Sequence, residues 1–260
     1  MKLRLFNIMV ILLSTVCASG QEGETNRLDG NGQKTGVWKK YYDNGNLMYE
    51  GNFENGQPVG MFIRYYEGGI KKAEMDFRSG GKISYARLYY ENGDLAAVGK
   101  YEGQLKDSIW DYYSFYNRRL ALTEGYRMGK KYGFSIKYYD DGKVAEKLEY
   151  KDDIMHGTWE QYFENGIPRL ICRNVDGKMN GAFVSFNPDS TYSITGTFDM
   201  GKMIEKWTYY TENNEIDIVL EYVDGVMIPN PEFEARQKEF SKLLENRTRP
   251  MDEPDSVFFR

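Results

Sequence analysis

The chain is short of the side chains on which most active sites and metal sites depend. Among its 260 residues it has two cysteines, Cys17 and Cys172, and a single histidine, His156. Metal binding and nucleophilic catalysis usually need several such groups close together. A Gly-rich phosphate loop and a serine-nucleophile motif are missing too. We therefore expect a protein that is not an enzyme, with no catalytic residue, no metal site and no cofactor.

The scarcity of cysteine also excludes an intrachain disulfide bond. Cys17 lies in an N-terminal segment that we expect to be removed, which leaves Cys172 without a partner. Cys172 follows Leu170 and Ile171 in a strand-like stretch, so we predict a buried structural thiol. The fold must then be held together by packing alone.

Long apolar runs are missing after the N-terminus. Residues 5–16 are almost wholly apolar, follow Lys2 and Arg4, and precede small residues at 18–20. This pattern is typical of a cleaved secretion signal and is too short to span a membrane. We predict a signal peptide at 1–20, export to the periplasm, the cell surface or the medium, and no membrane insertion afterwards. A short buried helix or anchor stays open, as does lipidation at Cys17, although residues 14–16 match a lipoprotein signal poorly.

Basic residues are too few and too scattered to attract polyanions. The chain has 34 Lys and Arg against 39 Asp and Glu, and its net charge of −5 becomes −7 once Lys2 and Arg4 are removed. A polyanion-binding protein usually carries a basic patch. This balance argues against nucleic-acid binding and against attraction to anionic membranes.

What the chain does have is a repeat of 24 residues. Tyr41, Tyr65 and Tyr89 keep this step, and so do Gly45, Gly69 and Gly93. In the first unit two strand-like runs, 37–42 and 47–53, enclose an Asn-Gly turn, which is typical of a β-hairpin. A fixed period of this length indicates a repeat architecture in which neighbouring units bury each other's apolar surface.

Eight units can be traced, and they divide the mature chain. We predict a polar linker at 21–31, repeats at 32–228, a capping helix at 229–246 and a flexible tail at 247–260. Within the repeats, residues 28–35 are expected to supply a strand that closes the first edge. The fourth unit is irregular, because Asn117-Arg118-Arg119 replaces the glycine turn. We expect a bulge or kink there. The units begin near Gly36, Gly60, Ser84, Ser108, Gly133, Gly157, Gly181 and Glu205.

The repeat resembles a known family. The segment Gly36-Val37-Trp38-Lys39-Lys40-Tyr41-Tyr42-Asp43-Asn44-Gly45 resembles the MORN repeat, and more closely its bacterial variant, and the resemblance extends over about residues 32–225. It implies an all-β fold, an elongated single-layer antiparallel sheet of consecutive hairpins. It also implies a protein that scaffolds or binds other proteins. A rival resemblance, to the aromatic repeats of cell-wall-binding modules, implies a glycan ligand.

One column of tyrosines is the candidate binding site. Neighbouring residues of a strand point to opposite faces, so Trp38 and Tyr42 share one face and Tyr41 takes the other. We predict that a tyrosine ladder on the second face binds a protein or peptide partner, with a cell-wall glycan as the alternative. The same ladder could instead serve only to stabilise the sheet through cross-strand pairs. Its members are Tyr41, Tyr65, Tyr89, Tyr138, Tyr162 and Tyr210.

Overall fold

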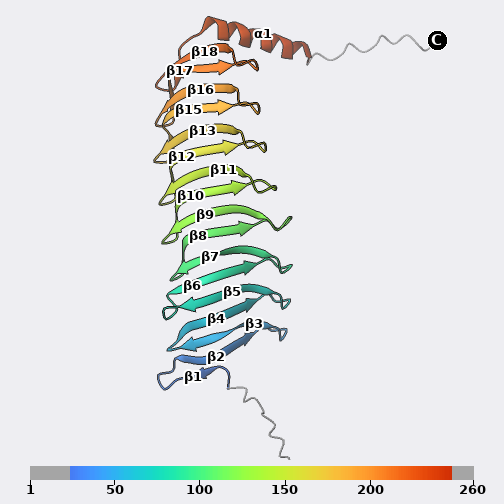
Figure 1. The fold of residues 1–260 in the computed structure, drawn as a ribbon, viewed down its shortest axis with the longest axis vertical. Helices are drawn as coiled ribbons and strands as arrows, with labels where there is room; N and C mark the ends of the chain where they lie inside the picture. The colour runs from blue at the N-terminus through green and yellow to red at the C-terminus, as the bar shows by residue number, and fades with distance from the viewer. Residues whose placement is uncertain (1–23, 248–260) are drawn as a thin grey trace, which may run out of the picture.

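A single open antiparallel sheet makes up almost all of the protein in the computed structural model, which describes residues 24–247 (Figure 1). Within that range, 19 strands follow one another in chain order and are succeeded by one helix. The predicted fold class is therefore confirmed. The predicted signal peptide at 1–20 lies outside the described residues, as do the first residues of the linker and the tail beyond residue 247.

Eight hairpins form the body of the sheet, and three strands of two residues complete it. β1 pairs with β2 and closes the first edge, and only its second residue, Leu28, lies within the residues 28–35 that were expected to supply this strand. The short strands are β1 (Arg27–Leu28), β14 (Lys178–Met179) and β19 (Val226–Met227). The hairpins are β2 (Lys34–Tyr41) with β3 (Leu47–Glu54), β4 (Gln57–Tyr65) with β5 (Lys71–Arg78), β6 (Ile83–Tyr89) with β7 (Leu95–Glu102), β8 (Leu105–Tyr113) with β9 (Leu120–Arg127), β10 (Lys130–Tyr138) with β11 (Val144–Lys151), β12 (Ile154–Tyr162) with β13 (Pro168–Val175), β15 (Gly181–Phe186) with β16 (Tyr192–Asp199), and β17 (Lys202–Tyr210) with β18 (Ile216–Val223).

The turn inside each hairpin follows from its Asn and Gly residues. In the first unit the Tyr42 N–H donates to the Asn46 carbonyl at 2.8 Å, and the Asn44 side chain accepts from the Asn46 N–H at 2.9 Å. Gly45 has a φ of 86°, a conformation that costs glycine little. The last residue pair of all eight hairpins is shifted by one residue, so a bulge recurs at the same place in every unit.

A second set of turns joins one unit to the next. Asn55 and Gly56 both have positive φ, 48° and 73°, which is the geometry of a tight two-residue hairpin turn. The Gly56 N–H donates to the carbonyl of Lys34 in the preceding turn region at 3.0 Å. Equivalent bonds, such as the one from Gly177 to Met155 at 2.8 Å, tie these turns together along one side of the sheet.

The irregular fourth unit takes up its extra residue in the turn. The Ser114 N–H bonds to the Arg119 carbonyl, five residues on, whereas Tyr42 bonds to a carbonyl four residues on. Arg118 has a φ of 62° in this longer turn. The register shift between Tyr112 and Tyr113 is the one that every unit has. The bulge predicted for this unit is therefore not a special feature of it.

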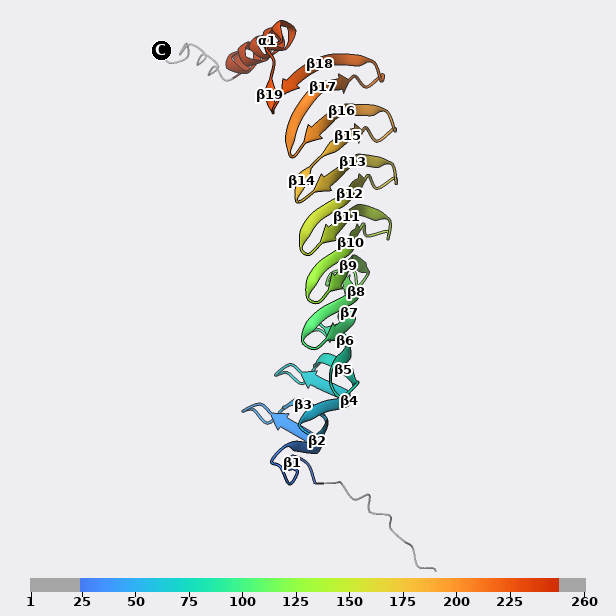
Figure 2. The ribbon, with the colours of Figure 1, turned by 90° about the vertical axis from the view of Figure 1, so that its left-hand side faces the viewer.

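One face of the sheet is tightly packed, and we call it the packed face; the opposite one is the open face. On the packed face Trp38 is paired with Gly51, and Gly51 with Phe62. The Phe62 ring lies over Gly51, where a Cβ would clash with it. Large and small residues are matched in the same way at Gly99 under Trp110 and at Gly196 under Trp207. Figure 2 shows that the strands are arched rather than flat.

Aromatic rings continue this packing along the array. Phe53 makes edge-to-face contacts with Trp38 and Phe62, with ring centroids 6.1 and 5.9 Å apart, and Phe62 contacts Phe77 in the same way at 5.9 Å. Trp110 is fully buried. Because the contacts run from unit to unit, each hairpin is stabilised by its neighbours.

Helix α1 (Pro231–Arg247) lies at the C-terminal end of the array (Figure 1). It begins two residues after the predicted start at 229, because the Asn230 side chain accepts from the Phe233 N–H at 3.0 Å and Pro231 occupies the first turn. Arg236 binds Asp217 of β18 at 2.8 Å, whereas Phe240 and Leu243 are exposed. Among residues 24–247, no helix is long and apolar enough to cross a membrane.

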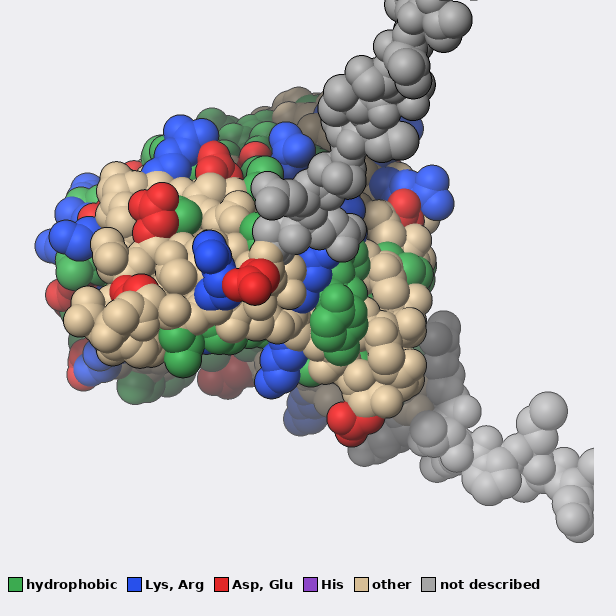
Figure 3. Space-filling view, turned by 90° about the horizontal axis from the view of Figure 1, so that it is seen from below, with side chains coloured by type: hydrophobic (Ala, Val, Ile, Leu, Met, Phe, Trp, Pro, Cys, Tyr) green, Lys and Arg blue, Asp and Glu red, His purple; other side chains and the backbone are tan. Residues whose placement is uncertain are grey.

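Charges are mixed over the surface. Seen from the N-terminal end of the array, acidic and basic side chains are interspersed (Figure 3). This distribution matches the scattered basic residues of the sequence.

Candidate interaction surface

The predicted tyrosine ladder lies on the open face of the sheet. The Tyr65 hydroxyl donates to Glu50 at 2.8 Å, and the Tyr89 hydroxyl donates to Glu74 at 2.6 Å. Glu50 is paired with Ile63, which places it on the same face as Tyr65. Each of these tyrosines therefore reaches back across one hairpin to a carboxylate on its own face.

The other four members occupy the same position in their own units. Tyr138 and Tyr210 lie 3.4 Å from threonine hydroxyls fifteen residues earlier in the chain, the same offset as for Tyr65 and Tyr89. Tyr162 donates to Glu160 at 2.9 Å, and Tyr41 is half exposed. The six tyrosines thus form a line, with at most one in each unit, and do not converge on a single pocket.

The carboxylates hold the neighbouring phenols in their protonated form. Burial, followed by the hydrogen bond and the negative charge of Glu50, raises the pKa of Tyr65 to about 12. The same causes, with Glu74 as the partner, raise the pKa of Tyr89 to about 12. The hydrogen bond from Lys71, then the one from Tyr89, lowers the pKa of Glu74. At neutral pH these pairs are phenol donors on carboxylate acceptors.

A second tyrosine column, next to the ladder in sequence, has a structural role. The Tyr42 hydroxyl donates to the carbonyl of Tyr65, 23 residues on, at 2.8 Å. Tyr66, Tyr90 and Tyr139 make the same bond to the next unit at 2.6–2.7 Å. These bonds join consecutive hairpins.

An exposed apolar row on the open face was missed by the sequence reasoning. It has one member in each of the first five units, 24 residues apart up to Ile109 and 25 residues apart from Ile109 to Phe134, and each is between 40% and 57% exposed. They stand four residues before the ladder positions on the same strands, so they share the face of the ladder. The sequence does contain this recurring apolar position, but a different residue type occupies it in each unit. The members of this apolar row are Val37, Met61, Tyr85, Ile109 and Phe134.

A hollow of about 740 Å³ lies in the middle of the apolar row. Met61, Tyr85 and Ile109 line it together with charged side chains of both signs, among them Asp76 and Arg87. Its size is within the range of ligand-binding clefts. Apolar side chains surrounded by charges of both signs are typical of a surface that binds another protein.

The row does not continue into the C-terminal half of the array. At the same repeat step the chain has Thr158, Ala182 and Lys206. The two halves of the open face therefore differ in character, although their backbones repeat.

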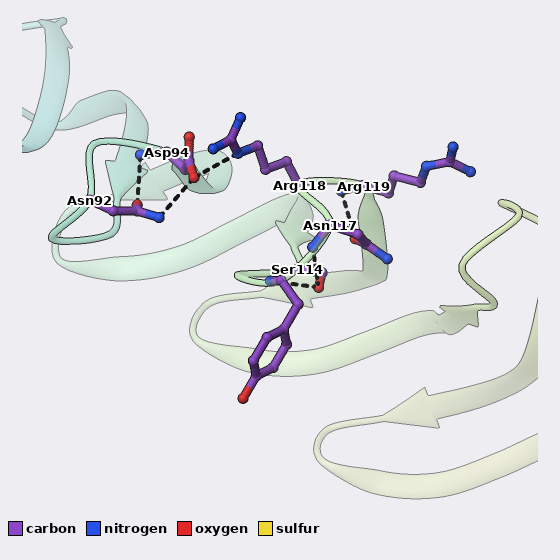
Figure 4. A network of polar contacts seen from close by, with 7 residues as sticks. Asn92, Asp94, Ser114, Asn117, Arg118 and Arg119 are labelled. Atoms are coloured by element: carbon purple, nitrogen blue, oxygen red, sulfur yellow. Dashed lines mark hydrogen bonds and ion pairs between the residues drawn. The ribbon is translucent and has the colours of Figure 1, made fainter.

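The long turn of the fourth unit is a further exposed feature. Arg118 binds Asp94 of the preceding turn at 2.8 Å, and Arg119 donates to the Asp140 carbonyl of the following turn at 2.7 Å. Figure 4 shows Arg118 directed towards Asp94. Tyr116, at the tip of this turn, is 94% exposed. The turn is thus anchored on both sides and presents an aromatic side chain to solvent.

Residues that could carry chemistry are isolated from one another. Burial raises the pKa of the Cys172 thiol to about 11, which makes it a poor nucleophile. His156 has Asp176 as its nearest acidic neighbour, at 3.8 Å. Among the described residues, no group of three His, Cys, Asp or Glu side chains could hold a metal ion.

Comparison with known proteins identifies the repeat. The family described as MORN repeat variant matches residues 34–55, 135–152 and 155–172. The first segment covers β2 and β3, and the other two cover β10 to β13. No curated protein matches the chain.

Proposed function

Since the chain is a MORN-repeat protein with repeats of the variant type, we propose that it is a non-enzymatic binding module for another protein, and that it scaffolds this partner along the open face of its first five units. MORN repeats generally mediate interactions with proteins or membranes and are a non-enzymatic type of repeat. The choice of a protein partner rests on the surface described above.

The apolar row is the observation that carries the proposal. Tyr85 and Phe134 contact the neighbouring cations Arg78 and Lys147, but all five side chains of the row are at least 40% exposed, so burial within the sheet does not explain why they are apolar. Van der Waals contact with a partner would bury these side chains and stabilise a complex by about 25 cal/mol for each Å² removed from water. The tyrosine ladder, on the same face, adds rigid amphipathic side chains beside the row.

The dimensions of this surface suit a protein interface. Ten strands at about 4.8 Å give a length of about 48 Å, and four residues along a strand separate the two rows by about 13 Å. The resulting area is on the order of 600 Å², close to the roughly 800 Å² that each partner contributes to a standard interface. A partner seated there could contact both rows at once.

We also propose that the protein works outside the cytoplasm. The support is the N-terminal pattern of residues 1–20, a positive start, a short apolar core and small residues before residue 21. The partner would then be a protein of the cell envelope or the medium.

A pull-down from an envelope extract of the encoding organism tests the proposal. The baits are residues 21–260 and a variant with Met61→Asp and Ile109→Asp, which places two charges in the apolar row. The matched control carries Thr158→Asp and Ala182→Asp, the same change at equivalent exposed positions of the other half. We expect one protein to be recovered by the native bait and the control and to be lost with the row variant.

Two results would contradict the proposal. Equal recovery by all three baits would place the contact elsewhere. Recovery of nothing, together with saturable binding of soluble cell-wall polysaccharide, would favour the glycan alternative.

A further inference from the structure

A second hollow, of about 1060 Å³, lies on the packed face across β4 to β7. Its apolar lining includes Ala73, Met75, Phe77 and Tyr101. Three cations, Arg64, Lys72 and Lys82, line it as well, and no carboxylate side chain is among the lining residues. Of the ladder and the apolar row it includes only Tyr89, and most of its lining belongs to the packed face.

Part of the hollow exists because Ala73, which lines it, replaces a ring of the repeat by a methyl group. In the first unit Tyr49 stacks on Phe62, with ring centroids 5.2 Å apart. The residues that follow Tyr49 at the repeat step are Ala73 and Ala97. Ala86 likewise stands between Phe62 and Trp110, at the position that the other two fill with rings. Ala86 itself is buried, because Met75, Leu88 and Tyr101 pack against the cluster that it forms with Ala97 and Trp110.

In the described part of the chain, Lys72 has one aromatic partner, the Tyr66 ring, whose centroid lies 5.1 Å from its Nζ, whereas Arg64 and Lys82 have none. Lys34 lies 4.4 Å from the ring centre of Trp38, and Lys106 lies 4.8 Å from that of Trp110. Lys82, although it is one repeat before Lys106, lies in the turn before β6, because Phe77 is paired with Ser84 there whereas Tyr101 is paired with Lys106. Among residues 24–247, Arg64, Lys72 and Lys82 make no ion pair, and all three are exposed. The hollow therefore combines a space of aromatic size with uncompensated positive charge.

A ligand that fits this hollow carries aromatic rings next to carboxylates. A ring would restore the contacts that Tyr49 and Phe62 make in the first unit, and it could lie beside Lys82 as a cation–π partner. Carboxylates would pair with the three cations at the rim of the hollow. The chain itself contains such a segment beyond the described residues. Within 252–259 it has Asp252, Glu253 and Asp255, followed by Phe258 and Phe259.

We propose that the hollow on β4 to β7 binds residues 252–259 of a second copy of this chain. The segment cannot reach the hollow of its own copy. β18 and β6 are eleven strand steps apart, about 53 Å, because β14 and β15 both pair with β13, and α1 lies beyond β18 in both views (Figures 1 and 2). The eleven residues from 248 to 258 span at most about 37 Å. The contact is therefore head to tail, and repetition of it builds open chains of copies.

Sedimentation velocity over a range of concentrations tests this contact. For residues 21–260 we expect the mean mass to rise beyond that of a dimer as the concentration increases, because each added copy presents a free hollow. Phe258→Ala with Phe259→Ala should weaken this association at least tenfold and leave the fold intact. A synthetic peptide of residues 251–260 should compete with the native tail and return the chains to monomers.

The second variant fills the hollow. Ala73→Tyr introduces a tyrosine at the position that Tyr49 occupies in the first unit, so the repeat should accommodate it. An unchanged circular dichroism spectrum would verify that the variant is folded. Ala73→Tyr should block self-association as well. An equimolar mixture of Ala73→Tyr with the Phe258→Ala, Phe259→Ala variant should form a dimer and stop there, because one partner supplies the only intact tail and the other the only open hollow.

Charge supplies a matched pair of variants. Lys82→Glu should weaken association about as much as the removal of the phenylalanines. Lys40→Glu, at an exposed position of the first unit outside the hollow, should have no effect. A native chain that stays monomeric at all concentrations would overturn the proposal, and so would self-association that either the phenylalanine variant or Ala73→Tyr leaves unchanged.

Discussion

At the scale of single residues, two tyrosines that are neighbours in sequence have different roles. Tyr65 points to the open face, where its hydroxyl binds the side chain of Glu50. Tyr66 binds the carbonyl of Tyr89 in the next unit, at 2.7 Å. Strand alternation separates the two, so only the first column is available to a partner, whereas the second holds the units together.

The structural role of the second column predicts a loss of stability. Tyr66→Phe keeps the ring but leaves the Tyr89 carbonyl without its donor, which should lower the free energy of unfolding by about 1 kcal/mol. Urea denaturation followed by circular dichroism would measure it. Tyr85→Phe is the control, since Tyr85 is exposed and the loss of its hydroxyl should leave the free energy of unfolding unchanged. An unchanged midpoint for Tyr66→Phe would show that the bond contributes nothing.

The raised pKa values predict a loss of stability at alkaline pH. The phenols of Tyr65 and Tyr89 have pKa values of about 12 in the fold, against 10.0 for the unperturbed group. The unfolded chain therefore loses these protons first, so the contribution is complete below about pH 10 and is lost as the pH rises towards 12. As the pH rises through this range, the urea midpoint of the Tyr65→Phe, Tyr89→Phe double variant should fall less steeply than that of the native protein. The account fails if both proteins give the same slope.

At the scale of the strand pair, β9 and β10 contain a polar substitute for an apolar contact. Glu124 is buried and accepts from Tyr126 at 2.6 Å, and Lys131 lies 2.5 Å from it. One repeat later the corresponding residues are Leu148 and Met155. The repeat thus tolerates either an ion pair or two apolar side chains at this place.

This equivalence predicts opposite results for a single and a double change. Lys131→Met leaves the buried Glu124 without its cation and should cost about 2–3 kcal/mol, less than for a fully buried pair because Lys131 is partly exposed. Adding Glu124→Leu should restore most of the lost stability, since the two residues then match Leu148 and Met155 of the following unit. The denaturant midpoints of the native protein, Lys131→Met and the double variant would test this prediction. A double variant no more stable than Lys131→Met would refute the equivalence.

The turns between units offer a stabilising change. Met128 has a φ of 50° and is largely exposed, at a place where the first unit has Asn55. A left-handed backbone strains most side chains, but asparagine adopts it more readily. Met128→Asn should therefore raise the free energy of unfolding by up to about 1 kcal/mol, seen as a higher melting temperature. Met251→Asn, outside the described fold, is the control. A lower melting temperature for Met128→Asn would mean that its side chain contributes to packing.

At the scale of the whole molecule, periodicity explains how much of the fold was predictable. The step from Tyr41 to Tyr65 and the Asn-Gly turns are local signals, so strand pairing and register followed from them. Where the extra residue of the fourth unit is accommodated did not follow, because either a bulge or a longer turn can absorb it. The structure places it between Ser114 and Arg119.

The candidate site was harder to predict than the fold. The tyrosine ladder was visible because one residue type recurs, and its binding role stays a prediction. The apolar row was not recognised, because Val37, Met61 and Tyr85 are of different residue types and share only their apolar character. The packed-face hollow was hidden for a different reason. The effect of Ala73 depends on which side chains surround it, and those contacts come from neighbouring strands.

Covalent footprinting of side chains, with and without the protein recovered by the pull-down, would test the central claim most directly. The account predicts that binding protects Met61, Tyr85 and Phe134 on the open face of the first five units. It also predicts that Tyr192 and Phe240, which are exposed in the C-terminal part, stay as reactive as in the free protein. Protection of Tyr192 or Phe240 with none at Met61 and Tyr85 would contradict it.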